Sequence, residues 1–169
     1  AGSYRLASFG IEPLPPEAIV DGAVMNTGAV VDAIRRLVEK ARVKTKEAVV
    51  SISGNSVIIK RINLPVMTME ELEESIQWEA EQYIPFDIND VNIDVQLLDD
   101  ASDDPGQMEV LLVAARKELV SEYQSLIHQA GLKPVVVDVD AFAVANMFEF
   151  NYGTVTDSIA LVNVGAGNV

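Results

Sequence analysis

The sequence predicts an α/β fold in which a small α+β unit is inserted into a domain built on a parallel sheet. Strands and helices alternate in the flanking residues 1–54 and 116–157, whereas residues 55–115 read as strand, helix, strand, strand. The strands also change character. Residues 91–98 alternate apolar and polar side chains, as in a half-buried strand, while residues 135–139 are nearly continuously apolar, as in a parallel sheet.

The first flanking part is expected to hold a strand at residues 4–11, stopped by the proline-rich residues 12–16. A helix should follow, capped by Asn26 or Thr27, and then a strand at residues 47–53. The expected buried stripe of that helix consists of Val30, Val31, Ile34, Leu37, Val38 and Ala41.

The stretch 68–86 predicts the central helix of the inserted unit. Thr68 followed by Glu71 is a capping box, and further glutamates crowd the first turns, where the helix dipole favours negative charge. The pattern puts an apolar stripe on one face and ends the helix at Pro85. The expected stripe consists of Leu72, Ile76, Ala80, Tyr83 and Ile84.

The remaining expected strands of the insert are residues 56–64, 91–98 and 108–115. The second flanking part should contain helices at 117–130 and 141–150 around the strand 135–139. A last buried strand is expected at 158–164, followed by a glycine turn. The boundaries predicted on this basis are 1–54, 55–115, 116–157 and 158–169.

Composition limits the function. The 169 residues are 49% hydrophobic and contain no cysteine, which excludes thiolate metal sites and disulfides. No apolar run is long enough to span a membrane. The net charge is −14, and residues 67–169 hold three Lys/Arg against twenty Asp/Glu. Nucleic acid is therefore not expected as a partner, whereas a basic partner suits the acidic surface.

Few residues are candidates for chemistry. His128 is the only histidine and is expected at the surface near a helix end, and the aspartates at 99–104 read as a solvated hairpin tip rather than a cation site. Asp138 and Asp140 end a predicted parallel strand, at the sheet edge where ligands bind, although a helix-capping role fits them equally. The turn Gly165-Ala166-Gly167 suits either a phosphate or an ordinary hairpin.

Three stretches together resemble a known family: TMEELEESIQWEAEQYIPFDINDVNIDVQLLD, MEVLLVAARKELV and PVVVDVDAFAVANMFE. They are similar to the PilM family of type IV pilus assembly proteins, which is actin-like and related to FtsA. The resemblance implies an actin/Hsp70-like (ribonuclease H-like) fold, with subdomain 1A in the two flanking parts and subdomain 1C at 55–115. It also implies that residues 158–169 open the second actin-like half with its second phosphate motif.

The resemblance further implies a nucleotide site in the intact protein, with ATP and Mg²⁺ as cofactors. Asp140 would orient the attacking water, and Asn163, Gly165, Ala166 and Gly167 would contact the phosphates. Two departures stand out: the first phosphate motif and the adenosine motif are missing, and Asn163 and Ala166 replace the usual Asp and Gly. We therefore expect this chain to be a fragment or truncated copy with no cofactor or catalysis of its own, and weak ATPase activity at most in the intact protein.

The family's role implies a cytoplasmic scaffold, peripheral to the inner membrane through its partners and used in twitching motility. The implied partners are the N-terminal cytoplasmic tail of the inner-membrane protein PilN, other platform proteins of the pilus, and further copies of the chain. An FtsA-like cell-division protein and an active ATPase motor are the alternatives.

The docking site expected for the tail is a groove between the 1A sheet and the inserted unit, beside the strand at 56–64, because an open strand edge can pair with an extended peptide. Trp78, which is off the stripe of its helix, is either an anchor for the tail or packed under the turn at 87–89. The candidate contact residues are Val57, Ile58, Ile59, Lys60, Arg61, Ile62 and Trp78.

Overall fold

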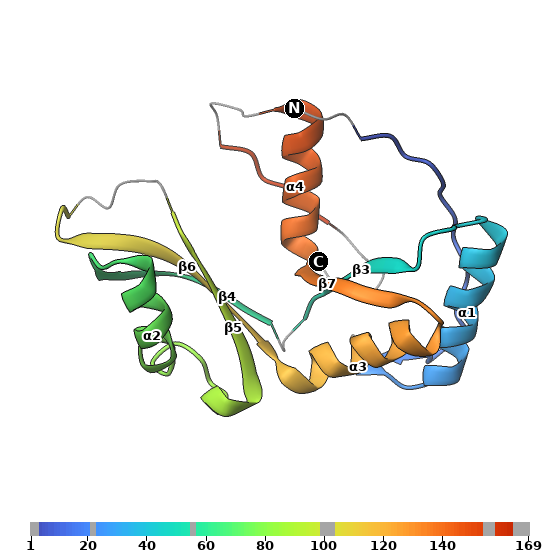
Figure 1. The fold of residues 1–169 in the computed structure, drawn as a ribbon, viewed down its shortest axis with the longest axis horizontal. Helices are drawn as coiled ribbons and strands as arrows, with labels where there is room; N and C mark the ends of the chain where they lie inside the picture. Colours follow the sequence, from blue (N-terminus) through green and yellow to red (C-terminus); the bar gives the residue numbers. More distant parts are fainter. Residues whose placement is uncertain (1–3, 21–22, 55–56, 99–103, 154–157, 164–169) are drawn as a thin grey trace. The chain divides into compact units, whose positions relative to one another are not determined.

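The computed structural model describes residues 4–20, 23–54, 57–98, 104–153 and 158–163. The chain divides into two compact units (Figure 1): Ala1–Gly54 together with Glu122–Val169, and the inserted Asn55–Ser121. The inserted unit thus extends past the expected end at residue 115. In the described part of the chain, no helix is both long and apolar enough to cross a bilayer.

The flanking unit buries its core between two helices and a short hairpin. Helix α1 (Thr27–Lys40) begins at Asn26, whose side-chain oxygen accepts the N–H of Ala29, as the capping pattern predicts. The hairpin of β1 (Ile19–Val20) and β2 (Ala23–Val24) was not predicted, and it precedes α1 directly. Helix α3 (Lys117–Gln129) closes the core from the other side. The buried core residues are Ala18, Val30, Val31 and Leu126.

Strands β3 (Glu47–Ile52) and β7 (Lys133–Val139) of this unit pair in parallel, as the apolar run at 135–139 predicts. Gly131, at φ +85°, ends α3 and turns the chain into β7, while α4 (Asp140–Tyr152) begins directly after β7. The run is apolar, but Val135 and Val136 are about half exposed. In the described residues, only β3 pairs with β7, so their sheet has two strands.

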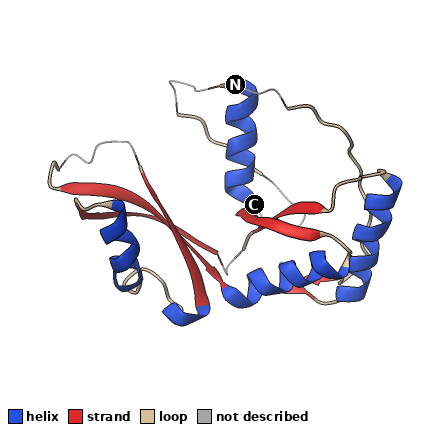
Figure 2. Cartoon of the chain, viewed as in Figure 1, coloured by secondary structure: helices blue, strands red, loops and turns tan. Residues whose placement is uncertain are grey.

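The inserted unit is an antiparallel sheet covered by a helix. Strands β4 (Val57–Pro65), β5 (Val91–Leu97) and β6 (Gln107–Arg116) lie in the order β4-β6-β5, which makes β6 the central strand. Figure 2 shows α2 (Met69–Ala80) beside this sheet, and the short 3₁₀ turn Ile88–Asp90 leads into β5. Helix and sheet enclose one cluster, at whose centre Leu72, Val110 and Leu112 are almost completely inaccessible.

Helix α2 confirms the predicted capping box. The Glu71 N–H donates to the Thr68 hydroxyl, and the Thr68 N–H donates to the Glu71 carboxylate at 2.8 Å. These contacts with Thr68 hold the pKa of Glu71 below its ordinary value. The helix ends at Ala80, earlier than expected, because Tyr83 and Ile84 continue as a turn that folds Ile84 back into the core.

Two predicted strands are absent. Residues 4–11 and 158–163 have no regular structure and are almost entirely exposed. Their apolar residues fit a strand, but a strand is stable only beside a hydrogen-bonded neighbour, and no strand pairs with either segment in the described part of the chain. Residue 164, the end of the second expected strand, lies outside the described residues.

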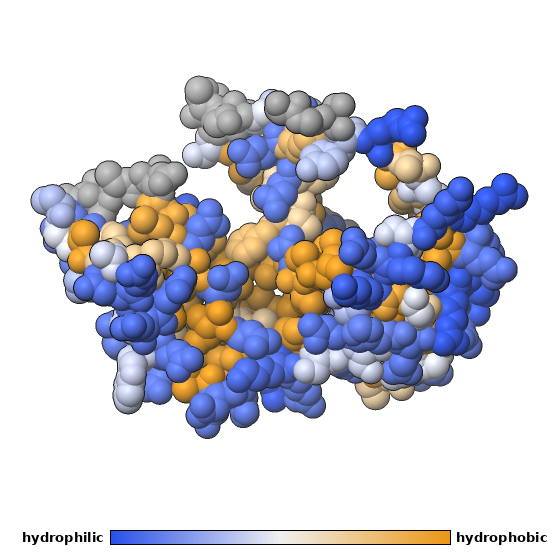
Figure 3. Space-filling view, in the orientation of Figure 1, coloured by the Kyte–Doolittle hydropathy of each residue, from blue (hydrophilic) through white to orange (hydrophobic). Residues whose placement is uncertain are grey.

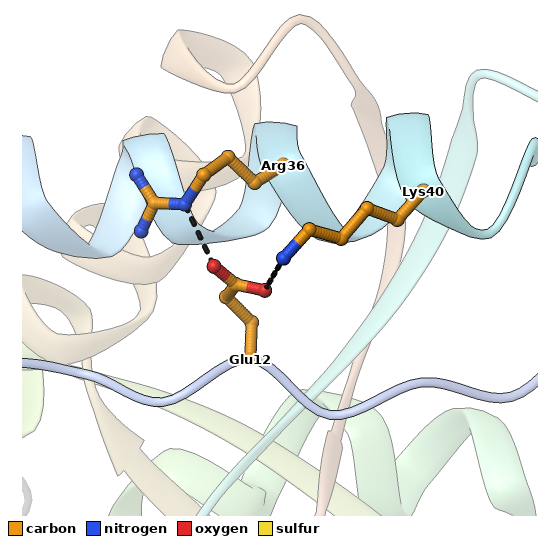
Figure 4. Close-up of polar contacts among 3 residues, drawn as sticks. All are labelled: Glu12, Arg36 and Lys40. Atoms are coloured by element: carbon orange, nitrogen blue, oxygen red, sulfur yellow. Dashed lines mark hydrogen bonds and ion pairs between the residues drawn. The ribbon is translucent and has the colours of Figure 1, made fainter.

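The N-terminal segment is held to α1 by side chains instead. The Glu12 carboxylate accepts from Arg36 Nε at 2.7 Å and from Lys40 Nζ at 2.6 Å (Figure 4). Ser8 Oγ also donates to the carbonyl of Ala41. The hydrogen bonds from Lys40 and then Arg36 lower the pKa of Glu12. The segment therefore lies along α1 as an extended strap.

Candidate functional site

Strand β4 is an edge strand of the inserted sheet and presents a free backbone edge. Strand β4 pairs with β6 through nine consecutive residues and, among the described residues, with no strand on its other side. The Leu98 N–H donates to the carbonyl oxygen of Glu109. The backbone groups of Glu109, and of every second residue after it in β6, therefore form hydrogen bonds with β5. The residues of β6 between them form hydrogen bonds with β4 instead. Their partners across the ladder are the even-numbered residues of β4, so the backbone groups of Ile59, Arg61 and Asn63 face away from β6.

Side chains of β4 alternate between the two faces of the sheet. Ile62 is 3% exposed in the core under α2, and Ile58 packs against the same core. Lys60 lies on that face as well, with Nζ 6.0 Å from the centre of the Tyr83 ring. Val57, Ile59 and Arg61 point to the opposite face. Of the predicted contact residues on β4, these three therefore have side chains that point away from the core under α2.

The face opposite α2, which we call the back face, continues this surface onto the central strand. Leu111 and Val113 of β6 lie across from Arg61 and Ile59, and both are only half-buried. Arg61 also pairs with Glu109 at 3.7 Å. No described helix of the inserted unit packs there, so the back face joins apolar side chains to the open backbone edge. An extended peptide requires both features.

Trp78 lies elsewhere on the unit. Its side chain is 75% exposed on α2, so it does not pack under the turn at 87–89. Because α2 covers one face of the sheet and Ile59 points to the other, the sheet separates the two side chains. The predicted contact residues therefore form two surfaces rather than one.

The sequence held a signal for this division that the prediction did not use. Ile58, Ile62 and Leu64 recur at even spacing in 57–65, which assigns them to one face of a strand. Taking every residue from Val57 to Ile62 as a contact residue ignored that alternation.

The predicted nucleotide residues are only partly described. Asp140 is the first residue of α4 at the end of β7, and Asn163 lies in the exposed segment 158–163. Gly165, Ala166 and Gly167 lie outside the described residues. The capping role considered for Asp138 is wrong: α4 has no side-chain cap, and Asp138 Oδ1 accepts the N–H of Val139 at 2.7 Å.

Asp140 has one electrostatic neighbour of note. Burial, then the charges of Glu122 and Asp140, raises the pKa of Tyr123 above its ordinary value. His128 is exposed in the last turn of α3, as expected. In the described residues, no three carboxylate or histidine side chains converge to hold a metal ion. Asp140 is thus a carboxylate at a strand end, and no metal-binding set surrounds it in the part of the chain that the structure describes.

The fold and the open edge define an α/β protein with an inserted α+β unit, in which one edge of β4 has no strand beside it among the described residues. The model of the type IV pilus assembly protein PilM family matches residues 1–169. The chain belongs to the PilM family. This confirms the PilM family and the α/β fold class expected from the sequence.

A solved structure agrees with this assignment. The chain is similar to a chain of a PilM–PilN type IV pilus biogenesis complex, with 35% identity and a TM-score of 0.75. The match covers 86% of this chain and 44% of that one, so this chain spans less than half of its solved relative. The cytoplasmic domain of EpsL, an inner-membrane component of the Vibrio cholerae type II secretion system, matches at 17% identity with a TM-score of 0.46. That match covers 64% of this chain and 42% of the other.

Proposed function

We propose that this chain is a cytoplasmic scaffold component of the type IV pilus machinery that binds the cytoplasmic tail of the inner-membrane protein PilN. Membership in the PilM family supports the pilus role, and the matched PilM–PilN complex supports the partner. The observation that carries the docking site is the β4 edge, which is nine residues long and has no strand beside it in the described part of the chain.

The tail binds as an added strand. Its backbone pairs with the outward N–H and C=O groups of Ile59, Arg61 and Asn63, and its apolar side chains contact Val57 and Ile59 on the back face. Arg61 is 63% exposed and pairs only loosely with Glu109, so its guanidinium is available to an acidic group of the tail. Backbone pairing gives affinity, and the alternate side chains give specificity.

The remaining predicted contact residues have supporting roles. Ile58 and Ile62 fix the register of β4 from inside the core, and Lys60 packs over Tyr83. Trp78 is assigned to a second contact on the outer face of α2, because an exposed tryptophan offers a large apolar area to a partner.

The test is the affinity of a fluorescent PilN tail peptide, measured by anisotropy. We expect Ile59→Asp to weaken binding by about tenfold, since it places an unpaired charge against the added strand. Leu97→Asp is the matched control: Leu97 is 47% exposed on the opposite edge strand, against 39% for Ile59, and its replacement should change the affinity less than about twofold. Equal losses for the two variants would exclude the β4 edge.

A backbone variant tests strand pairing directly. Arg61→Pro removes an N–H that faces the edge rather than β6, so the sheet should tolerate it while tail binding is lost. Arg61→Ala removes the side chain alone and should cost less affinity. Circular dichroism establishes that each variant folds. Native tail affinity in a folded Arg61→Pro variant would contradict binding by strand addition.

We also propose that nucleotide binding belongs to the intact protein only. Asp140, at the carboxyl end of a parallel strand, suits orientation of a water molecule. Asn163, Gly165, Ala166 and Gly167 are assigned to phosphate contacts by family resemblance. ATP with Mg²⁺ would supply the phosphoryl group there, while this chain by itself presents only part of a phosphate clamp.

A further inference from the structure

The outer face of α2 carries the only tryptophan of the chain. The helix buries Leu72, Ile76 and Ala80 against the sheet, so Trp78 lies on the side that faces away from the core. Trp78 is 75% exposed, and within the described residues its side chain forms no hydrogen bond and no ring contact. The second contact proposed for Trp78 therefore offers a partner both a free aromatic ring and a free indole N–H.

Two carboxylates flank this ring. Glu74 precedes Trp78 by four residues and Glu81 follows it by three, and these spacings place side chains next to one another on a helix surface. Glu81 caps the C-terminal end of α2 and keeps helical backbone angles, φ −54° and ψ −30°. Both glutamates are exposed, and neither side chain forms an ion pair or hydrogen bond within the described part of the chain. Hydrophilic side chains cover α2 in Figure 3.

The C-terminal end of α2 is an unfavourable place for negative charge. The helix dipole puts partial negative charge there, so cations stabilise a helix end of this kind and carboxylates do not. Helix α2 has no basic residue in its last turn, where Glu79 lies, and Glu81 follows directly. A cation bound beside Trp78 would therefore offset the charge of the glutamates and of the helix end together.

The inserted unit already pairs its other aromatic rings with cations. Its sequence contains three aromatic residues, which are Trp78, Tyr83 and Phe86. Lys60 Nζ lies 6.0 Å from the centre of the Tyr83 ring, and the guanidinium carbon of Arg116 lies 5.5 Å from the centre of the Phe86 ring. An indole ring attracts cations more strongly than either of these rings, yet no described cation lies over Trp78.

The inserted unit has no spare cation for this site. Its sequence contains four basic residues, and two of them lie over the rings just described. Of the other two, Arg61 pairs with Glu109 at 3.7 Å, and Lys117 donates to the carbonyl of Asn89 at 2.7 Å. A cation over Trp78 therefore has to come from outside this unit.

We propose that the outer face of α2, formed by Glu74, Trp78 and Glu81, binds an arginine-bearing segment of a partner protein. Planar guanidinium groups of the segment stack on the indole ring and donate to the flanking carboxylates. Nucleic acid and anionic lipid headgroups do not fit, because the glutamates repel phosphate. The proposal rests on the second contact assigned to Trp78 in the proposed function and names the chemistry of the partner there.

The intrinsic fluorescence of the unmodified full chain tests the proposal directly, because Trp78 is the only tryptophan. The probe is a seven-residue peptide of alternating arginine and glycine. The matched peptide carries citrulline in place of arginine, since citrulline has the shape of arginine without its charge. We expect the arginine peptide to change the emission of Trp78, and the citrulline peptide to bind at least about fivefold more weakly. Unchanged emission, or equal affinity of the two peptides, would overturn the proposal.

Variants locate the site through the anisotropy of the labelled arginine peptide. Glu74→Gln/Glu81→Gln removes the flanking carboxylates and should weaken binding about fivefold. The matched control Glu70→Gln/Glu73→Gln removes the same charge from the first turns of the same helix and should change the affinity less than about twofold. Trp78→Leu keeps an apolar side chain without the ring and should also weaken binding about fivefold. Equal losses in the two double variants, or native affinity in Trp78→Leu, would overturn the proposal.

Tail docking at the β4 edge is judged separately from this site. Ile59→Asp, which tests the β4 edge, should leave the affinity for the arginine peptide within about twofold. A loss in Ile59→Asp as large as that in Trp78→Leu would place the arginine peptide on β4 and overturn the assignment to α2. If the arginine peptide does not bind at all, the proposal for α2 fails while tail docking at β4 stands on its own test. Circular dichroism establishes that each variant folds.

Discussion

Replacement of Leu112 by alanine should unfold much of the inserted unit. Leu112 is completely inaccessible on the central strand β6, between the sheet and α2. Loss of a buried leucine costs about 2–5 kcal/mol, through lost apolar transfer and the cavity left behind. A whole domain is stable by only about 5–15 kcal/mol, so this one change removes a large share of the stability.

The matched variant is Leu111→Ala, one residue earlier on the same strand. Leu111 points to the back face and is only half-buried, so its loss should cost about 1 kcal/mol or less. Urea unfolding followed by circular dichroism gives both values, and hydrogen exchange of peptides from β4 and β6 locates the effect in the inserted unit. Equal destabilisation by the two variants would refute the assignment of faces, and with it the back-face surface proposed for the PilN tail.

Three further outcomes are expected. Thr68→Ala removes the cap of α2 and should lower stability by about 1 kcal/mol, measured by urea unfolding, whereas Thr68→Ser should restore most of it. Because the pKa of Glu12 is lowered, its ion pairs with Lys40 and Arg36 stabilise the folded protein fully at a pH above the ordinary carboxyl pKa. This stabilisation is lost as the pH falls through the lowered pKa. Hydrogen exchange should therefore show residues 4–12 leaving α1 in acid, whereas Glu12→Gln should release these residues from α1 at neutral pH. Calorimetry should detect no micromolar ATP binding by this chain, and Asp140→Ala should reduce any ATPase activity of the intact protein without changing its fold.

The sequence predicted correctly those features that depend on residues close together in the chain. The capping box of Thr68 and Glu71 fixes the start of α2, and Asn26 fixes the start of α1, because caps depend on residues three positions apart. The alternation at 91–97 predicted β5 together with its buried side. The nearly apolar residues 135–139 predicted a parallel strand, although its exposure was predicted wrongly.

Strand pairing could not be predicted in the same way. Residues 4–11 and 158–163 have strand-like composition and remain irregular, because a strand depends on hydrogen bonds to a segment distant in sequence. The sequence likewise could not show that β4 and β5 are both edges, since only the order β4-β6-β5 places β6 between them.

By itself, the sequence determined the family, the α/β class, and the helix caps, all of which depend on residue identity and short-range spacing. The tertiary structure decided which side chains are buried and which are exposed. Ile62 is buried under α2, whereas Ile59 lies on the back face. Trp78 is exposed on α2, which covers the opposite face of the sheet from Ile59. The physical reason is that exposure of a strand residue depends on what packs over each face, and that packing comes from distant parts of the chain.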